Sequence, residues 1–537
     1  MQKITADQAA HLIQDGDSVL ISGSGGGHAV PETLLAAVER RFLAEGAPRG
    51  LTSVSIVGIG DRATLGASHL AHEGLLRRTI TSALVDSPGL DRLAAEDKIE
   101  AYTFPQGVLS QLMRDMAAGR PGLITKTGLH SFVDPRQQGA RQSARTPIDF
   151  VEVVNLVGEE WLLFKPIPAN VAFLRGTTAD EDGNVTMEQE AVLGEMLAMA
   201  QATRRAGGIV IVQVKRMARR GTLPAKQVKI PGILVDFVVV DPQQRQTYAT
   251  DYDPSYAGEL RIPVEHIKPL PFGPRKVIVR RAAMELFPQA ICNLGAGVST
   301  GLSTVAAEEG ILDDVHLTNE QGIIGGAPIT GRDSGGGQNF AAMIEQPSQF
   351  DFYDGGGLDL AFLSFAEVDP QGNVNVSRFG DRIIGVGGFI NIAQNAKCVI
   401  FSGTLTAGDL DVAWENGKTV IRREGRHRKF VPKVEQICYN ASSGRERTQL
   451  TLFVTERAVF RVGDDGLELI EVAPGLDPER DVVANMGFRP RIARDLKTMD
   501  ARIFSPGLMN LSADVHAKPR RYRSARLAEW HEKNGTT

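Results

Sequence analysis

"AFLRGTTADEDGNV", residues 172–185, returns as "AFLSFAEVDPQGNV" at residues 361–374, with 7 identical residues in 14 positions. Each copy is an apolar run that ends in a D-x-x-G-N turn. Upstream of each copy lie an apolar run, a glycine-rich loop and a helix pattern, in "VLISGSGGGHAVPETLLAAV" and "AICNLGAGVSTGLSTVAAEEG". A chance match around two similar turns would not carry this shared order of elements. The repeat therefore predicts two related halves that arose by internal duplication.

Both halves have the pattern of an α/β fold. Apolar, β-branched runs bounded by glycine are typical of buried parallel strands, and they are "SVLISG", "SVSIVGIG", "GGIVIVQV", "DFVVVD", "AICNLGAG" and "KCVIFSG". Between them lie helix patterns such as residues 31–46, with Pro31 near the first turn and Gly46 at the end. We predict two open, mostly parallel sheets.

The two predicted domains cover residues 1–262 and 275–537. They are joined near residues 261–276, a stretch with four prolines and few helix signals. The first half is longer because of an insertion that includes residues 123–141.

Composition narrows the class of protein. A chain of 537 residues is too long for one hydrophobic core, and a net charge of −5 gives no reason to expect a nucleic-acid partner. Three widely spaced cysteines, Cys292, Cys398 and Cys438, argue against a disulfide framework and favour buried thiols in a reducing compartment. The start lacks the apolar core of a signal peptide, and no apolar run approaches the length of a membrane span. We expect a cytoplasmic protein without a membrane partner.

Two glycine-rich loops could hold a ligand. Residues 22–32, "SGSGGGHAVPE", could bring backbone close to a phosphate or thioester, but a structural turn explains the loop equally well. Residues 297–301, "GVSTG", match the G-x-S-x-G nucleophile elbow. An acyl-ester or acyl-CoA hydrolase using Ser299 is therefore the alternative reading. Such an enzyme needs a histidine partner, and none of the later histidines lies in a recognisable setting, so a loop whose amides face a ligand is preferred. Patterns for a P-loop, a zinc protease or an EF-hand are absent, so no metal site is expected.

Two glutamates precede glycine by two residues. Glu415 lies in "WENGKTVIRREG", where Asn-Gly predicts a hairpin turn and hence an exposed, solvated carboxylate. Glu320 ends "DDVHLTNE" and precedes "GIIGGAP", at the predicted carboxyl end of a strand, where α/β sheets bind their ligands. Glu320 is the stronger candidate for chemistry.

Together these motifs resemble the family I CoA-transferases, and most closely the single-chain acetate/propionate type. The resemblance covers nearly the whole chain, in order, through "DGDSVLISGSGGGHAVPE", "YTFPQGVLSQLMR", "TGLHSFVDPR", "LRGTTADEDGNVT", "NLGAGVS", "NEQGIIGG", "GVGGFINIAQNAK" and "KFVPKVEQI". It implies the CoA-transferase fold, with an α-subunit-like first half and a β-subunit-like second half that carries the nucleophile.

The resemblance also implies roles for individual residues. Glu320 takes the position of the family's nucleophile, whereas Glu415 lacks the flanking residues. Thr318, Asn319 and Gln321 differ from the usual flanks, which bears on the choice of substrate. Further implied roles are an oxyanion-binding amide at Gly387 or Gly388, a glutamine beside the nucleophile at Gln106, and a CoA-contacting loop of Gly295, Ala296, Gly297, Val298 and Ser299.

The reaction implied by the resemblance moves CoA from a short-chain acyl-CoA to a free acid of the acetate, propionate, butyrate or 3-oxoacid class, as in short-chain fatty acid and ketone body metabolism. It proceeds by ping-pong kinetics through a glutamyl-CoA thioester. CoA enters as a substrate, with no prosthetic group. A homo-oligomer, dimer or tetramer, is expected.

Overall fold

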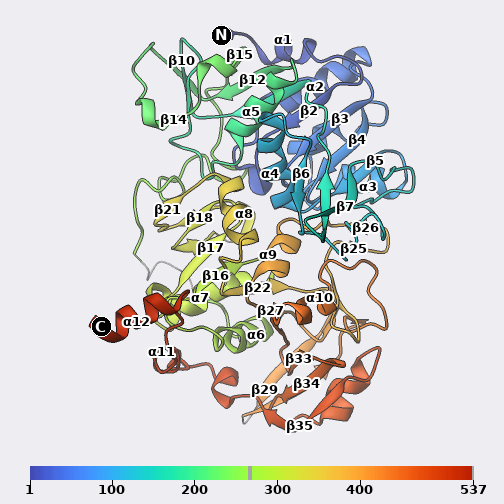
Figure 1. Ribbon diagram of the computed structural model, residues 1–537, viewed down its shortest axis with the longest axis vertical. Coiled ribbons are helices and arrows are strands. Elements are labelled where there is room, and N and C mark those ends of the chain that lie inside the picture. Colours follow the sequence, from blue (N-terminus) through green and yellow to red (C-terminus); the bar gives the residue numbers. More distant parts are fainter. Residues whose placement is uncertain (264–268, 330, 416, 535–537) are drawn as a thin grey trace.

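The computed structural model describes residues 1–263, 269–329, 331–415 and 417–534. Two large sheets, one built from residues 2–240 and one from residues 291–498, lie one above the other along the long axis (Figure 1). Most of their strand pairs are parallel, so the predicted α/β class is confirmed. The domain limits at residues 262 and 275 stay predictions, and residues 264–268 of the predicted linker lie outside the described residues.

The first sheet is parallel throughout, in the order β1-β15-β12-β9-β2-β3-β4-β5. Its strands are β1 (Gln2–Lys3), β2 (Ser18–Ile21), β3 (Leu51–Ser55), β4 (Leu76–Thr81), β5 (Glu100–Thr103), β9 (Val171–Arg175), β12 (Ile209–Val214) and β15 (Phe237–Val240). Its helices are α1 (Ala6–His11), α2 (Glu32–Glu45), α3 (Pro88–Ala95), α4 (Gln106–Ala117) and α5 (Met196–Arg205). The α2 helix follows Pro31 and ends at Gly46, whose φ of 68° suits glycine, as the sequence predicts.

The second sheet has the order β21-β18-β17-β16-β22-β27-β32-β33-β34-β35; its centre is parallel, antiparallel pairs follow on both sides, and the edge pair β34–β35 is parallel again. Its strands are β16 (Ile291–Leu294), β17 (His316–Asn319), β18 (Ile323–Ile324), β21 (Ala342–Met343), β22 (Leu360–Ser364), β27 (Cys398–Ser402), β32 (Leu450–Val454), β33 (Ala458–Gly463), β34 (Gly466–Val472) and β35 (Arg491–Thr498). Its helices are α6 (Pro274–Ala283), α7 (Gly301–Glu308), α8 (Gln346–Asp354), α9 (Phe389–Asn395), α10 (Ala441–Glu446), α11 (Leu511–His516) and α12 (Ala525–Asn534).

The two copies of the sequence repeat occupy equivalent places. The β9 strand pairs with β2 and β12, and β22 pairs with β16 and β27, so each copy supplies a central strand. The turn that follows is the same in both. Asp180 accepts hydrogen bonds from the Asn184 backbone and side chain, at 2.9 and 3.0 Å, and Asp369 does the same with Asn373, at 3.0 and 2.9 Å. This equivalence is what a duplicated unit would produce.

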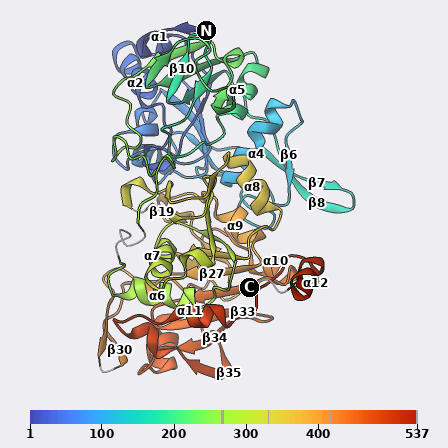
Figure 2. The same ribbon diagram turned by 90° about the vertical axis from the view of Figure 1, so that its left-hand side faces the viewer.

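Smaller sheets decorate the two halves. The insertion contributes β6 (Leu123–Thr125), which joins β7 (Val151–Leu156) and β8 (Glu159–Phe164) in a three-stranded sheet whose hairpin projects from the body (Figure 2). A four-stranded sheet contains β10 (Thr178–Asp180), β11 (Val185–Thr186), β13 (Arg216–Ala218) and β14 (Val228–Ile230). Two-stranded ribbons pair β19 (Ala327–Pro328) with β20 (Gly337–Gln338), β23 (Glu367–Val368) with β24 (Val374–Asn375), β25 (Arg378–Phe379) with β26 (Arg382–Ile383), β28 (Thr406–Ala407) with β31 (His427–Arg428), and β29 (Asp411–Glu415) with β30 (Lys418–Arg423).

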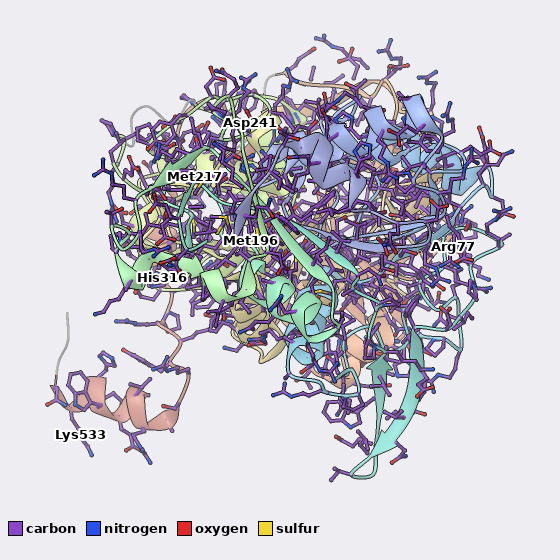
Figure 3. All side chains as sticks on the ribbon, turned by 90° about the horizontal axis from the view of Figure 1, so that it is seen from above. Arg77, Met196, Met217, Asp241, His316 and Lys533 are labelled. Atoms are coloured by element: carbon purple, nitrogen blue, oxygen red, sulfur yellow. The ribbon has the colours of Figure 1, made fainter. Side chains whose placement is uncertain are left out.

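The halves share an apolar core where α4 packs against α8 and α9. Val108 and Leu109 of α4 belong to the same buried cluster as Phe350 of α8 and Ile390 of α9. By contrast α12, which has no buried residue and carries Lys533, stands apart from the body (Figure 3). The three cysteines are free and buried, as the sequence predicts.

Candidate active site

A cavity of about 240 Å³ lies where the two halves meet, lined in part by the first turn of α9, whose label Figure 1 shows between the two large sheets. Backbone hydrogen bonds tie the halves together beside it: Val386 N–H to Ser82 O (2.8 Å) and Gln106 N–H to Gly387 O (2.9 Å). The lining consists of one carboxylate, backbone-rich loops and apolar side chains, namely Ala83, Gly295, Ala296, Glu320, Leu363, Ser364, Val376, Ile384, Gly385, Val386, Gly387, Gly388, Phe389 and Ile392. Two larger hollows, of about 650 and 500 Å³, contain none of the predicted site residues.

Glu320 reaches this cavity from the carboxyl end of β17. The chain reverses directly after it, since β18 pairs antiparallel with β17. Gly322 makes the reversal possible because its φ is 93° and a Cβ there would overlap the Ile344 carbonyl oxygen. The strand end thus places Glu320 where the sequence predicts it.

The Glu320 carboxyl is half-buried against apolar neighbours. Burial raises its pKa above the ordinary value, while its own backbone N–H and the Asn293 amide lower the pKa in part. A Cβ added at Gly388 would lie 3.5 Å from the Glu320 Cβ. The carboxyl is therefore poorly solvated and lies close to a glycine backbone.

The unusual flanks of Glu320 point into the protein, not into the cavity. Thr318, Asn319 and Gln321 are 4, 5 and 3% exposed. Asn319 accepts a hydrogen bond from Gln321 N–H (3.0 Å) and donates to Gly335 O (3.2 Å). None of the three lines the cavity. These three side chains therefore surround Glu320 from the protein interior and do not form the cavity wall.

The two candidate oxyanion glycines differ in what their amides already contact. Gly387 N–H donates to Ser82 O at 3.0 Å. For Gly388 N–H the described residues provide no acceptor. Gln106, at the start of α4, is buried, and its Nε2 likewise has no hydrogen-bond partner among the described residues. Gly388, next to Glu320, thus has an unused donor, whereas Gln106 has an unused donor but does not line the cavity.

The predicted CoA loop lies at the carboxyl end of β16, but only part of it lines the cavity. Gly295 and Ala296 do, whereas Gly297, Val298 and Ser299 do not. Ser364 holds the loop by donating to Ala296 O (2.9 Å) and accepting from Val298 N–H (3.1 Å). The Ser299 hydroxyl donates to Gly295 O (2.9 Å), and within the described chain it has no hydrogen bond with a histidine. This geometry gives the hydrolase alternative no support.

The other glycine loop, residues 22–32, packs against protein. A Cβ at Gly26 would lie 2.8 Å from Arg332 O, and one at Gly27 would lie 2.7 Å from Tyr248. The buried His28 ring contacts Asp333 O at 3.1 Å and Ser334 O at 3.2 Å. The structural-turn reading of this loop is thus the one that fits.

Glu415 is exposed at the end of β29 and forms an ion pair with Arg422 (2.7 Å). It does not line the cavity. The predicted exposure of Glu415 is confirmed, although residue 416 of the predicted Asn-Gly turn lies outside the described residues.

Sequence reasoning missed Asn293 and Tyr353 behind Glu320, as well as the apolar lining of Val386, Phe389 and Ile392. Asn293 lies within the quoted "NLGAG" motif, and a polar residue in an otherwise apolar strand was the available signal. The apolar residues carried no signal, because lining a cavity and filling a core use the same side chains.

Residues 3–241 match the coenzyme A transferase family. The chain is 42% identical, over 94% of its length and 96% of the relative, to the acetate CoA-transferase YdiF of Escherichia coli K12. It is also 42% identical, over 94% of its length and 97% of the relative, to the caffeate CoA-transferase of Acetobacterium woodii. A solved structure of the acyl-CoA transferase YdiF of E. coli O157:H7, in a thioester complex with CoA, superposes with a TM-score of 0.91 over 95% of this chain and 97% of that one, at 42% identity.

The described residues contain neither a membrane-spanning helix nor a cluster of metal-binding side chains. No helix among them is long and apolar enough to cross a membrane. No group of three or more His, Cys, Asp or Glu side chains among them could hold a metal ion.

Proposed function

The chain belongs to the family I CoA-transferases, in the single-chain form, and we propose that it transfers CoA between short-chain carboxylic acids through a covalent thioester on Glu320. It is a CoA-transferase with CoA as a substrate. One observation carries the proposal. Among the described residues, Glu320 is the only charged side chain that lines the cavity between the halves.

The Glu320 carboxylate attacks the carbonyl carbon of the acyl-CoA, and the C–S bond breaks to release CoA thiolate and leave a mixed anhydride. The thiolate then attacks the glutamyl carbonyl, which frees the first acid and forms the glutamyl-CoA thioester. A second acid reverses both steps. Each half-reaction conserves the thioester, so the kinetics are ping-pong. The thioester complex of the E. coli relative supports such an intermediate here.

The Gly388 amide is the proposed oxyanion donor. Each attack creates a tetrahedral oxyanion, and one backbone donor at that position is worth roughly 3 kcal/mol. Gly387 N–H already donates to Ser82 O, whereas Gly388 N–H has no acceptor among the described residues. Gln106 Nε2 is also unused, but Gln106 does not line the cavity, so its place beside the nucleophile stays a prediction. Gly295 and Ala296, which line the cavity, contact CoA. Gly297, Val298 and Ser299 lie outside the cavity lining and support the conformation of this loop.

The substrates proposed are apolar monocarboxylates such as acetate, propionate and butyrate. The cavity must also admit the thiol end of CoA, so the room left for an acyl group is small. Its walls are apolar, formed by Val386, Phe389 and Ile392. A second carboxylate, as in succinate, would enter without a cation among the described lining residues, at the cost of an unpaired buried charge.

Trapping the intermediate tests the proposal. Borohydride added after acetyl-CoA should reduce the glutamyl thioester to an alcohol, inactivate the enzyme and change the mass of the peptide containing Glu320. The matched variants are Glu320→Gln, which should show no trapping, and Glu415→Gln, which should behave as wild type. Trapping at another residue would refute the role of Glu320. A panel of acids that includes succinate and caffeate would test the substrate class.

The cellular setting is also a proposal. The three buried free thiols are compatible with a reducing compartment, and we place the enzyme in the cytoplasm as a dimer or tetramer. Light scattering of the purified protein would measure the oligomeric state, and a monomer at all concentrations would contradict it.

A further inference from the structure

Three buried polar side chains stand behind Glu320, outside the cavity lining. Asn293 on β16 and Thr318 on β17 are opposite each other in the parallel pair, and Tyr353 covers them from α8. They are 0, 4 and 0% exposed. Tyr353 OH lies 2.7 Å from Thr318 Oγ1, and Asn293 Nδ2 lies 3.2 Å from Tyr353 OH. Glu320 follows Thr318 by two residues at the end of β17, and hydrogen bonding by the Asn293 side chain lowers the pKa of its carboxyl.

The hydrogen bonds of this group run in one direction. The Thr318 hydroxyl donates to Cys292 O at 2.9 Å, a carbonyl that can only accept. Thr318 has no second hydrogen, so the Tyr353 hydroxyl must donate to Thr318. The single hydroxyl hydrogen of Tyr353 is then donated to Thr318, so the Tyr353 oxygen can only accept hydrogen bonds from the other groups that face it. Asn293 Nδ2 and the Gln349 side chain both face this oxygen, so Asn293 presents its NH2 group to it.

The second N–H of the same NH2 group is left for Glu320. A contact that lowers the pKa of a carboxyl is one in which the carboxylate accepts a hydrogen bond. The opposite amide orientation would turn the Asn293 carbonyl oxygen toward both Tyr353 and Glu320, where two acceptors would meet. Asn293 Oδ1 has no partner within the described chain, so nothing there competes for the orientation.

We propose that Tyr353 and Thr318 are positioning residues for the nucleophile: they orient the Asn293 amide so that its N–H, and not its carbonyl oxygen, faces Glu320. This inference rests on the proposed role of Glu320. The donor holds one carboxylate oxygen in place while the other attacks, and it holds the glutamyl carbonyl oxygen in the anhydride and in the thioester. The unusual Thr318 in the nucleophile's flank thus has an assigned task, which is to accept the tyrosine hydrogen.

The test compares variants that remove single hydroxyl groups. Tyr353→Phe and Thr318→Val keep the shape of the side chain and break the chain at different points. Each should lower kcat by about tenfold, the loss of one hydrogen bond to a charged group, with KM for acetyl-CoA unchanged. The double variant should be no worse than the more affected single variant, because both break one chain. Thr318→Ser keeps the hydroxyl and should restore most of kcat.

A second buried hydroxyl pair in the same half supplies the control. Tyr439 OH lies 2.7 Å from Thr451 Oγ1 and 2.8 Å from Gln449 Oε1, and none of these residues lines the cavity. Tyr439→Phe removes a comparable core hydrogen bond and should leave kcat unchanged. Equal losses in Tyr439→Phe and Tyr353→Phe would mean that core packing, not positioning, explains the effect, and the inference would fall.

The pH profile separates positioning from general destabilisation. Among the described residues, one ionisable group faces the Glu320 carboxyl, the phenol of Tyr353. Burial raises the pKa of both groups. Losing the amide donor raises the pKa of Glu320, so the acid limb of kcat/KM should move to higher pH in Tyr353→Phe. Wild-type kcat and an unmoved acid limb in Tyr353→Phe, with Glu320→Gln inactive, would overturn the positioning role and leave the proposed function standing. Trapping at a residue other than Glu320 would overturn both.

Discussion

Replacing Gly388 by proline removes a backbone N–H at a residue whose φ is already close to the one that the ring imposes. Gly388 has φ −81° and ψ 0°, close to the φ of about −65° that proline imposes. Gly388→Ala is the matched control because it keeps the N–H and adds the same Cβ. That Cβ would lie 3.2 Å from Ile392 Cδ1, 3.3 Å from Phe350 Cζ and 3.5 Å from Glu320 Cβ. Its neighbours need to yield by only a few tenths of an ångström.

The kcat values of the two variants should therefore differ by the contribution of one hydrogen-bond donor. Gly388→Ala should retain kcat within about tenfold, since a displacement well under 1 Å costs less than the roughly hundredfold of a full ångström. Gly388→Pro should lose a further factor of about 10² to 10³ in kcat, as expected for one oxyanion-hole donor. The difference between the variants, not either value alone, measures the amide.

Initial rates of CoA transfer from acetyl-CoA to propionate, with both substrates varied, give kcat and KM for each variant. The rate of the borohydride-trapped modification isolates the first half-reaction. Thermal unfolding shows whether the proline variant is folded. Equal kcat in the two variants would refute the assignment of the oxyanion donor to Gly388. A raised KM with kcat retained would show that the ring obstructs the substrate instead.

Glu320→Asp withdraws the carboxyl by one methylene and should lower kcat about 10²-fold. Glu415→Asp, on an exposed strand end, should leave kcat and KM unchanged. Similar losses of kcat in the two variants would contradict the different roles assigned to Glu320 and Glu415. Gly322→Ala places a Cβ against the Ile344 carbonyl oxygen at a φ of 93°. The free energy of unfolding should therefore fall by at least ~2 kcal/mol relative to wild type. An unchanged midpoint of thermal unfolding would disprove this strain. Burial raises the pKa of Glu195 to about 8, above its unfolded value, so its contribution to stability is complete below the unfolded pKa and is lost as the pH rises through about 8. Urea unfolding should show Glu195→Gln gaining stability relative to wild type between about pH 5 and pH 9, and a difference independent of pH would exclude the shift.

The sequence was a good guide to elements and a partial guide to the site. Glycine-bounded apolar runs such as those now in β2 and β27 predict buried strands because both faces of a parallel strand must be apolar. Glu320 could be found because a strand end followed by glycines is a local pattern. Asn293 could not be assigned to Glu320 in this way, because their contact depends on which strands pair and in what register, and local sequence does not contain that information. The same limit explains why only Gly295 and Ala296 of the predicted CoA loop line the cavity.

Departures from a family pattern next to a nucleophile are easily taken as changes in substrate. Here the residues concerned face the protein interior, since alternate positions of a strand point to opposite sides and the turn after β17 folds its flanks inward. Thr318 contacts Tyr353 and the Cys292 carbonyl, while Asn319 holds the segment that packs on His28 of the other half. A substitution at either position would therefore act first on the orientation of Glu320, hence on kcat for every acid alike. Discrimination between acids should instead respond to Val386, Phe389 and Ile392, whose side chains line the cavity itself.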